Sequence, residues 1–332
     1  MRILKLLFFV PLFVVVAYCV LWGSLALWFK LPASETVRAS VALAFGVFGI
    51  GTLIAFFYET IWRWLSMFSV VFLALVLWWN TLIPPSVGDW SAEVSQQVSG
   101  TIEGDILTLT NVRDFQWRTE EDFDEAWVTR SYDLSQIESL DLFMSYWGGP
   151  HMAHLMLSFG FSDGEYLAWS VEVRREKGEK FSPVADFFKA HSLSVVAGTE
   201  QDVVGLRSNI QLADVYLYRI QGDADRRRDL LERYVRGANR LTEKPAFFHS
   251  LLTNCSRTVI LLARSVGADI PADWRILVNG YFPSYLYDQG ALGTELSFEE
   301  VKEAAFISDR ALAHGLDNGY PDAIRATMQG MN

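Results

Sequence analysis

The first third of the chain consists of long apolar runs separated by short polar connections. Residues 6–29, 39–58 and 64–83 contain no charged side chain. A bilayer core about 30 Å thick needs roughly 20 apolar residues of helix, so each run is long enough to span it. The pattern predicts a three-helix transmembrane anchor within residues 1–85.

The basic residues that flank the runs suggest an orientation. Arg2 and Lys5 precede the first run and Arg63 precedes the third, which favours a cytoplasmic N-terminus. Lys30 and Arg38 lie at the opposite ends and do not follow this rule. A cleavable signal peptide would explain the first run alone, but the two further runs favour an uncleaved anchor. Residues after 83 are therefore expected outside the cytoplasm.

Residues 86–332 differ in composition and are expected to form one domain. They contain 23 basic and 37 acidic residues, whereas residues 1–85 contain five and two. Nucleic-acid surfaces need clustered Lys and Arg, so this acidic balance argues against a nucleic-acid partner.

Strict alternation of apolar and polar side chains predicts a β-hairpin in this domain. The odd positions of residues 153–161 and 167–173 are apolar, and the even positions are mostly polar or small. The loop 162–164 reads Ser-Asp-Gly, which is typical of a turn.

The same alternation fixes the hairpin register. A two-residue turn would place odd residues opposite even ones and split the apolar face. A three-residue loop with Gly164 in the left-handed region pairs residue 161 with residue 165 and keeps odd opposite odd. In this register His154 and Glu172 are direct cross-strand neighbours on the less apolar face.

Further strands are predicted at residues 106–110 and 139–146, so the fold class is α+β. Apolar spacing predicts an amphipathic helix over residues 225–241, ended by Pro245. A second helix is predicted to begin at Asn254, a favourable N-cap.

This second helix places Cys255 in its first turn. Free N–H groups at a helix start favour an anion, lower a thiol pKa and can stabilise an oxyanion. The other cysteine, Cys19, is expected to pack as a small apolar side chain, so no disulfide framework is predicted. The alternative for Cys255 is a buried structural cysteine.

A nucleophilic thiol needs a base, and His154 is the candidate because a carboxylate is predicted opposite it. The alternative is a histidine without a catalytic role. His151 flanks a Gly-Gly-Pro turn and is less fixed. No zinc site is expected, because no cysteine and histidine pair has ligand spacing apart from the coincidence of His151 and His154, and no cofactor is expected. The other histidines are expected at the surface: His191, His249 and His314.

Five blocks of sequence, in this order, resemble the Lnb N-terminal periplasmic domain family (DUF4105). They are residues 149–161, 166–174, 198–207, 215–218 and 253–255. The resemblance covers roughly residues 110–290. A histidine strand that precedes a cysteine helix also resembles the lecithin–retinol acyltransferase group. These resemblances imply a permuted papain-like (NlpC/P60-type) domain with an antiparallel sheet and a nucleophile helix.

The family resemblance implies a Cys–His thiol enzyme on the periplasmic side of the bacterial inner membrane. By position, Cys255 is the nucleophile, His154 the base, and Glu172 the residue that orients the imidazole. Asn254 and Ser256 shape the nucleophile turn and the oxyanion site. Three further positions match the family and are expected in a structural or substrate-binding ion-pair network: Arg174, Glu200 and Arg207.

This chain departs from the family in two respects. Many relatives follow the cysteine with two threonines and an asparagine, whereas here the residues are Ser256, Arg257 and Thr258. In the acyltransferase relatives the membrane spans follow the domain, and here they precede it. The departures weaken inferences about the substrate more than those about the chemistry.

Three functions remain open from the sequence. The first is an acyltransferase that takes an acyl chain from a membrane phospholipid and passes it to an amine, such as a lipoprotein N-terminus. The aromatic-rich residues 281–287 then either form part of an acyl-chain groove or, as favoured, pack in the core. The second is a membrane-tethered cysteine peptidase or amidase, and the third is a non-catalytic envelope protein. The predicted division is an anchor at 1–85 and a periplasmic Cys–His domain at 86–332.

Overall fold

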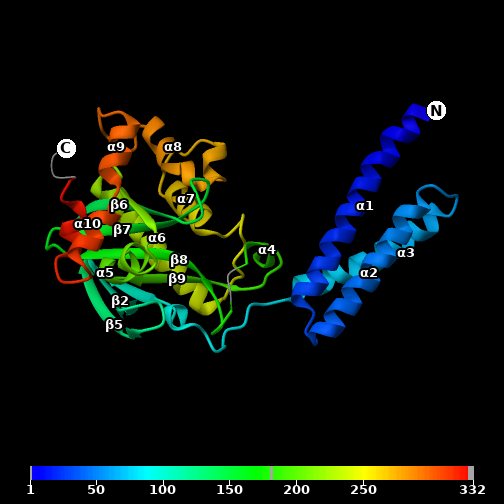
Figure 1. Cartoon of the computed structure of the whole chain (residues 1–332), viewed down its shortest axis with the longest axis horizontal. Helices are drawn as coiled ribbons and strands as arrows, with labels where there is room; N and C mark the ends of the chain where they lie inside the picture. Colours follow the sequence, from blue (N-terminus) through cyan, green and yellow to red (C-terminus); the bar gives the residue numbers. More distant parts are fainter. Residues whose placement is uncertain (1, 180–181, 328–332) are drawn as a thin grey trace. The chain divides into compact units, whose positions relative to one another are not determined.

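The computed structural model describes residues 2–179 and 182–327, and these form two compact units (Figure 1). One unit consists of Met1–Pro84 with Ser182–His191, and the other of Pro85–Phe181 with Ser192–Asn332. The short insertion 182–191 lies between two strands in the sequence but packs with the N-terminal helices.

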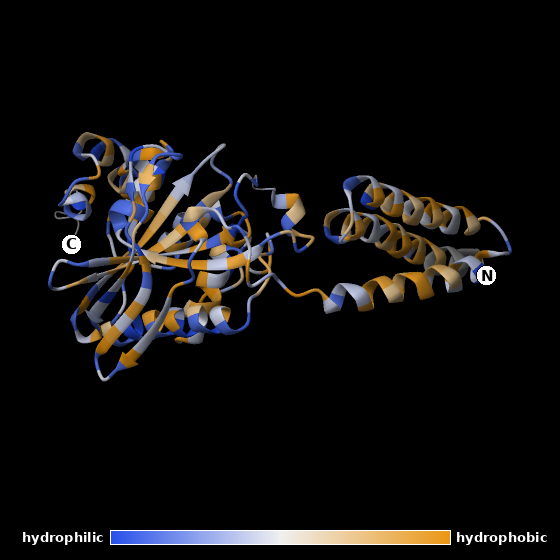
Figure 2. Cartoon of the chain, turned by 90° about the horizontal axis from the view of Figure 1, so that it is seen from below, coloured by the Kyte–Doolittle hydropathy of each residue, from blue (hydrophilic) through white to orange (hydrophobic). Residues whose placement is uncertain are grey.

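The first unit contains three helices that are long and apolar enough to cross a membrane. Helix α1 covers Arg2–Lys30, α2 covers Glu35–Ala55 and α3 covers Ile61–Thr81. Apolar residues recur along all three helices, as a lipid environment requires (Figure 2). The three predicted apolar helices are therefore confirmed, and the chain is a membrane protein.

Small residues allow α1 and α2 to approach closely. A Cβ atom added at Gly49 would lie 2.3 Å from Val20, and one at Gly23 would lie 2.5 Å from Phe45. Glycines that let two helix backbones meet are typical of packing within membranes.

The insertion carries the short helix α4, Pro183–Asp186, and a buried histidine. His191 Nδ1 lies 2.7 Å from Asp186 Oδ1. The expectation that His191 lies at the surface is therefore wrong, because the carboxylate gives its ring a buried partner. His249 and His314 are partly buried rather than exposed.

The second unit is built on a mostly antiparallel eight-stranded sheet. Its order is β1-β2-β9-β8-β7-β6-β10, with β5 also paired to β2, and β2 and β9 are parallel. The strands are β1 Ser99–Glu103, β2 Ile106–Arg113, β5 Trp127–Asp133, β6 Ile137–Tyr146, β7 Ala153–Phe161, β8 Tyr166–Arg174, β9 Ser192–Gly198 and β10 Asp214–Arg219. A separate two-stranded ladder joins β3 Gln116–Trp117 to β4 Phe123–Asp124.

Helices pack against both faces of this sheet (Figure 1). The first face carries α6 Ala224–Glu243, α7 Cys255–Ser265, α8 Phe282–Asp288 and α9 Phe298–Ala305. The second face carries α5 Glu200–Val203, α10 Ser308–His314 and α11 Tyr320–Arg325. Short 3-10 segments occur at Ala92–Val94, Leu134–Gln136, Trp274–Ile276 and Asn279–Tyr281, and a π-helical turn at Leu206–Ile210. The predicted strands, the helix at 225–241 and the α+β class are confirmed.

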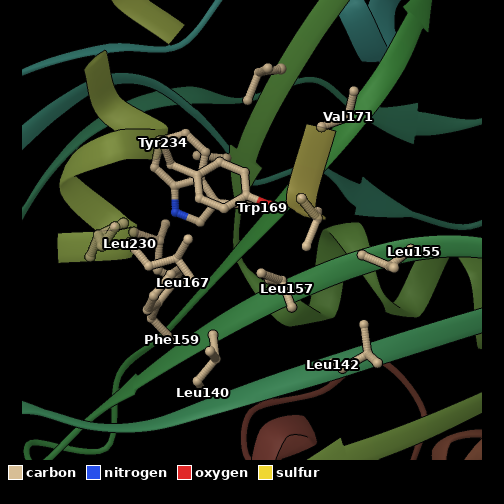
Figure 3. Close-up of a cluster of buried hydrophobic side chains, with 14 of the residues drawn as sticks. Leu140, Leu142, Leu155, Leu157, Phe159, Leu167, Trp169, Val171, Leu230 and Tyr234 are labelled. Atoms are coloured by element: carbon tan, nitrogen blue, oxygen red, sulfur yellow. The ribbon is translucent and has the colours of Figure 1, made fainter. Parts of the chain in front are cut away.

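The odd residues of the β7–β8 hairpin face α6. Leu157, Phe159 and Trp169 pack there, with Trp169 against Tyr234 at a ring-centroid distance of 5.2 Å (Figure 3). Burial of such large apolar side chains is the main favourable contribution to folding.

The even face of the hairpin is buried as well. Met156, Ser158 and Ala168 are inaccessible to solvent because α5, α10 and α11 cover them. The odd face of the hairpin is more apolar in composition than the even face, as expected, but helices cover both faces.

The predicted hairpin register is confirmed. Leu157 pairs with Trp169 and Gly160 with Tyr166, so odd residues oppose odd residues. Phe161 N donates to Glu165 O at 2.9 Å, and Gly164 has a φ of 87°. A three-residue loop with a left-handed glycine therefore closes the hairpin.

Candidate active site at the start of helix α7

Helix α7 begins at Cys255, and Asn254 caps it. The Asn254 side chain accepts a hydrogen bond from Arg257 N at 2.8 Å and donates one to Ser250 O at 2.6 Å. This cap satisfies one of the free N–H groups of the first turn. Both ends of the Asn254 amide are occupied, so the side chain fixes the turn that precedes Cys255.

Strands β7 and β8 separate where the helix meets them. Their ladder ends at the pair Met156–Ser170, although β7 starts at Ala153 and β8 continues to Arg174. Helix α7 packs on both strands. His154, two positions beyond the last pair, interacts with the Cys255 side chain closely enough to raise its own pKa and lower that of the thiol. The separation of the strands thus gives the thiol access to the imidazole.

The other side of the His154 ring meets a hydrogen-bonded chain. Its Nε2 lies 2.7 Å from Ser170 Oγ and 3.2 Å from Glu172 Oε1, and Ser170 Oγ donates to Glu172 Oε1 at 2.6 Å. Arg207 Nη2 pairs with the same carboxylate oxygen at 2.9 Å. Since Nε2 is engaged there, Nδ1 is the ring nitrogen left for the sulfur of Cys255.

These contacts stabilise a charged pair. Burial opposes ionisation of His154, but the Glu172 carboxylate and the hydrogen bond with Cys255 raise the His154 pKa to about 9. Burial likewise opposes the Cys255 thiolate, yet the hydrogen bond and charge of His154 lower the thiol pKa. Burial also opposes the Glu172 carboxylate, but His154 and Arg207 hold its pKa well below the usual range.

A second polar side chain, Asn279, joins strand β7 to helix α7. Its Nδ2 donates to Ala153 O and to Ser256 Oγ, each at 2.6 Å, and its Oδ1 accepts from Ala153 N at 3.0 Å. Ser256 is buried and adjoins Cys255. Asn279 therefore sets the spacing between the first residue of β7 and the first turn of α7.

The three charged residues expected in one network lie in separate places. Arg207 contacts Glu172 at the site, as described above. Arg174 donates to the carbonyls of Val94 and Ser95 and stacks over the Trp90 ring, 4.8 Å from its centroid.

Glu200 belongs to a different, fully buried cluster. It pairs with Arg325 at 2.6 Å, and Arg325 also pairs with Asp141 at 2.8 Å. Neither Arg174 nor Glu200 contacts the Cys255–His154 pair through these bonds, so both have structural roles here.

Other sequence candidates lie outside the pair. His151 is exposed, and its Nδ1 lies 2.9 Å from the Tyr281 hydroxyl. Phe282 and Tyr285 are buried in the core, which agrees with the favoured packing interpretation of residues 281–287. Among the described residues, no group of histidine, cysteine and acidic side chains is arranged to hold a metal ion.

Two members of the site were missed by the sequence analysis. Ser170 lies on the same strand face as Glu172, so the register that paired His154 with Glu172 also contained the signal for it. Asn279 is 126 residues from Ala153 and follows no pattern that sequence spacing reveals.

The fold and the site define a membrane-anchored α+β protein with a paired cysteine and histidine. Residues 123–280 match the model of the Lnb N-terminal periplasmic domain family. This match confirms the resemblance, and the chain carries this periplasmic domain on a membrane protein. The matched range 123–280 includes His154, Glu172 and Cys255. No curated protein and no solved structure matches the chain.

Proposed function

We propose that this protein is a thiol acyltransferase of the bacterial inner membrane that acts on its periplasmic side. The observation that carries the proposal is the coupled Cys255–His154 pair at the start of α7, in which the thiol pKa is lowered and the imidazole pKa raised. Catalytic nucleophiles have such shifted pKa values. The permuted papain-like layout, with the histidine strand before the cysteine helix, is part of this proposal.

In the first step the Cys255 thiolate attacks the ester carbonyl of a membrane phospholipid. The oxyanion that forms on the carbonyl oxygen lies at the helix start, where N–H groups and the helix dipole favour negative charge. The intermediate then collapses, and the carbon–oxygen bond to the glycerol breaks. His154 gives its proton to the departing oxygen, which leaves a thioester on Cys255 and a lysophospholipid.

In the second step an amine, such as the N-terminus of a lipoprotein, attacks the thioester. Neutral His154 takes a proton from the nitrogen as the carbon–nitrogen bond forms. The carbon–sulfur bond breaks, so the acyl chain leaves as an amide and the thiolate and imidazolium are restored. Glu172, through its direct contact and through Ser170, holds the imidazole in position and stabilises its positive charge.

Acyl transfer is favoured over peptide hydrolysis by the membrane helices. Three apolar helices would tether the domain that carries the thiol to the bilayer that contains both a phospholipid and a lipid-anchored acceptor. Restricting both substrates to one surface raises their effective concentration.

The test uses the full chain in vesicles that contain phosphatidylethanolamine and a synthetic diacylglyceryl lipopeptide with a free N-terminus. Mass spectrometry should find an acyl group on Cys255 that hydroxylamine removes, and an N-acylated lipopeptide. Cys255→Ala and His154→Ala should abolish the lipopeptide product, whereas Cys19→Ala should not.

Two results would overturn the proposal. Product formation that survives Cys255→Ala would exclude the thiol. Release of free fatty acid or of cleaved peptide in place of the N-acylated product would indicate a hydrolase instead.

A further inference from the structure

The three membrane helices leave an apolar groove between them. Its volume is about 490 Å³, within the range of about 300–1,000 Å³ typical of small-molecule sites. The lining comes from the end of α1, the first part of α2 and the second half of α3, and includes Leu27, Leu31, Ala44, Phe48, Val71 and Trp78. The groove therefore belongs to the half of the helix unit where α1 and α3 end and α2 begins.

A basic side chain whose Nε has no hydrogen-bond partner among the described residues lies at this end. Arg38 is in the first turn of α2, and its guanidinium carbon is 5.9 Å from the centre of the Trp28 ring. Its Nε is buried and has no hydrogen-bond partner among the described residues. A buried guanidinium nitrogen without an acceptor costs free energy, which indicates that a ligand atom completes this site.

The insertion supplies a second cation at the same end. Lys189 Nζ donates to Trp79 O at 2.7 Å and lies 4.7 Å from the centre of the Trp79 ring. Phe188 stacks on Phe29 at a centroid distance of 5.4 Å. Lys189 is thus held at the end of the helix unit where α1 and α3 end, which is the end to which the groove belongs.

The position of Arg38 also contradicts the usual distribution of charge in membrane proteins. Basic residues are depleted from non-cytoplasmic ends of spans, and Arg38 lies at such an end in the orientation derived above. An anionic lipid headgroup is the partner that a basic side chain finds at the membrane surface. A phosphate at this position would provide the missing acceptor for the guanidinium.

We propose that the groove binds one phospholipid, with an acyl chain in the apolar cavity and the phosphate between Arg38 and Lys189. The groove is apolar along its length, and two basic side chains lie at the same end of the helices, which matches the chemistry of that lipid. This site is separate from the Cys255–His154 pair and does not depend on whether that pair transfers acyl groups.

The experiment is native mass spectrometry of the full chain in detergent, titrated with phosphatidylglycerol. Wild-type protein should retain one lipid. Arg38→Gln with Lys189→Gln should weaken binding by at least about tenfold, from roughly 1 kcal/mol for each basic residue near an anionic headgroup. Ala44→Trp should fill the groove and abolish binding. The matched control is Arg63→Gln, an exposed arginine at the opposite end of the helices, which should leave binding unchanged.

A phosphatidylglycerol with a diazirine in its acyl chain provides a second measurement on unmodified protein. Crosslinks to the peptide that contains Ala44 and Phe48 support the groove. Equal loss of lipid in Arg63→Gln and in the double variant would show only a non-specific lipid shell and would overturn the proposal. It would also fail if crosslinks spread evenly over outward-facing positions such as Leu73, or if a second copy of the chain occupied the groove without lipid.

Discussion

His154 Nε2 lies 3.2 Å from Glu172 Oε1 across the β7–β8 hairpin, and the Ser170 hydroxyl is hydrogen-bonded to both. The hydroxyl accepts from the imidazole and donates to the carboxylate, so it fixes which ring nitrogen faces Cys255. The geometry of the thiol–imidazole pair therefore depends on a serine that is bonded to the imidazole and the carboxylate rather than to the sulfur.

Ser170→Ala should lower the rate of Cys255 alkylation by iodoacetamide by about three- to tenfold at neutral pH. The estimate follows from the loss of about 0.5–1.5 kcal/mol per hydrogen bond. Ser158→Ala is the matched control. Ser158, on β7, is buried on the same face of the hairpin as Ser170, and its hydroxyl has no partner among the described residues. An equal loss in both variants would indicate a packing effect rather than a positioning role for Ser170.

His154→Ala should raise the pH at which Cys255 becomes reactive. In the wild type the imidazolium lowers the thiol pKa, so reactivity extends to lower pH than that of an ordinary thiol and is lost as pH falls through the lowered value. Without His154, the burial of the thiol is opposed only by its interactions with Leu155 and Ser256, so the midpoint should move to higher pH. Alkylation rates across pH, measured in a Cys19→Ala background, give the midpoint.

His151→Ala is the control for this shift, because His151 is exposed and contacts Tyr281 instead. The same titration tests the imidazole itself. Acyl transfer should decline above pH 9, where the wild-type His154 loses the proton that it gives to the departing oxygen. A thiol midpoint that is the same in His154→Ala and the wild type would contradict the coupled pair.

Local sequence patterns predicted some elements of the fold and of the candidate site but not others. Parity along β7 and β8 was sufficient to place His154 opposite Glu172, because a one-residue slip would have moved every apolar side chain to the wrong face. The N-cap residue Asn254 predicted the start of α7 for an equally local reason. Both features are set by residues close in the chain.

Features that depend on distant segments were not predicted. The second face of the sheet is covered by α5, α10 and α11, which are too short to show a clear apolar period. Asn279 reaches Ala153 only because the chain folds back over the sheet. The burial of His191 follows from a single carboxylate, Asp186, five residues earlier.

Arg325→Met should destabilise the periplasmic domain by about 3–5 kcal/mol, the usual cost of removing one partner from a buried ion pair. Arg325 pairs with Asp141 and Glu200, and both carboxylates are inaccessible to solvent. In the variant, Arg219 would still pair with Asp141, but Glu200 would lose Arg325, the cation with which it pairs. Urea unfolding of the full chain, followed by near-UV circular dichroism, measures the change.

Arg226→Met is the control for this substitution. Arg226 pairs with Asp223 at the start of α6, where both side chains are more than half exposed, so its loss should cost less than about 1 kcal/mol. Similar unfolding midpoints for the Arg325 and Arg226 variants would show that the buried cluster does not hold α11 to the sheet.

Two glycine substitutions separate backbone conformation from packing. Gly164 has a φ of 87° in the hairpin loop, whereas Gly237 lies within helix α6, and neither would place a Cβ within 4 Å of a described heavy atom. Gly164→Ala should destabilise by more than about 1 kcal/mol, because alanine disfavours the left-handed region. Gly237→Ala should stabilise by about 0.5–1 kcal/mol, because alanine loses less entropy in a helix. The same urea titration should show midpoints that move in opposite directions. A Gly164→Ala midpoint at or above that of the wild type would mean that the loop does not require the left-handed residue on which the hairpin register was argued.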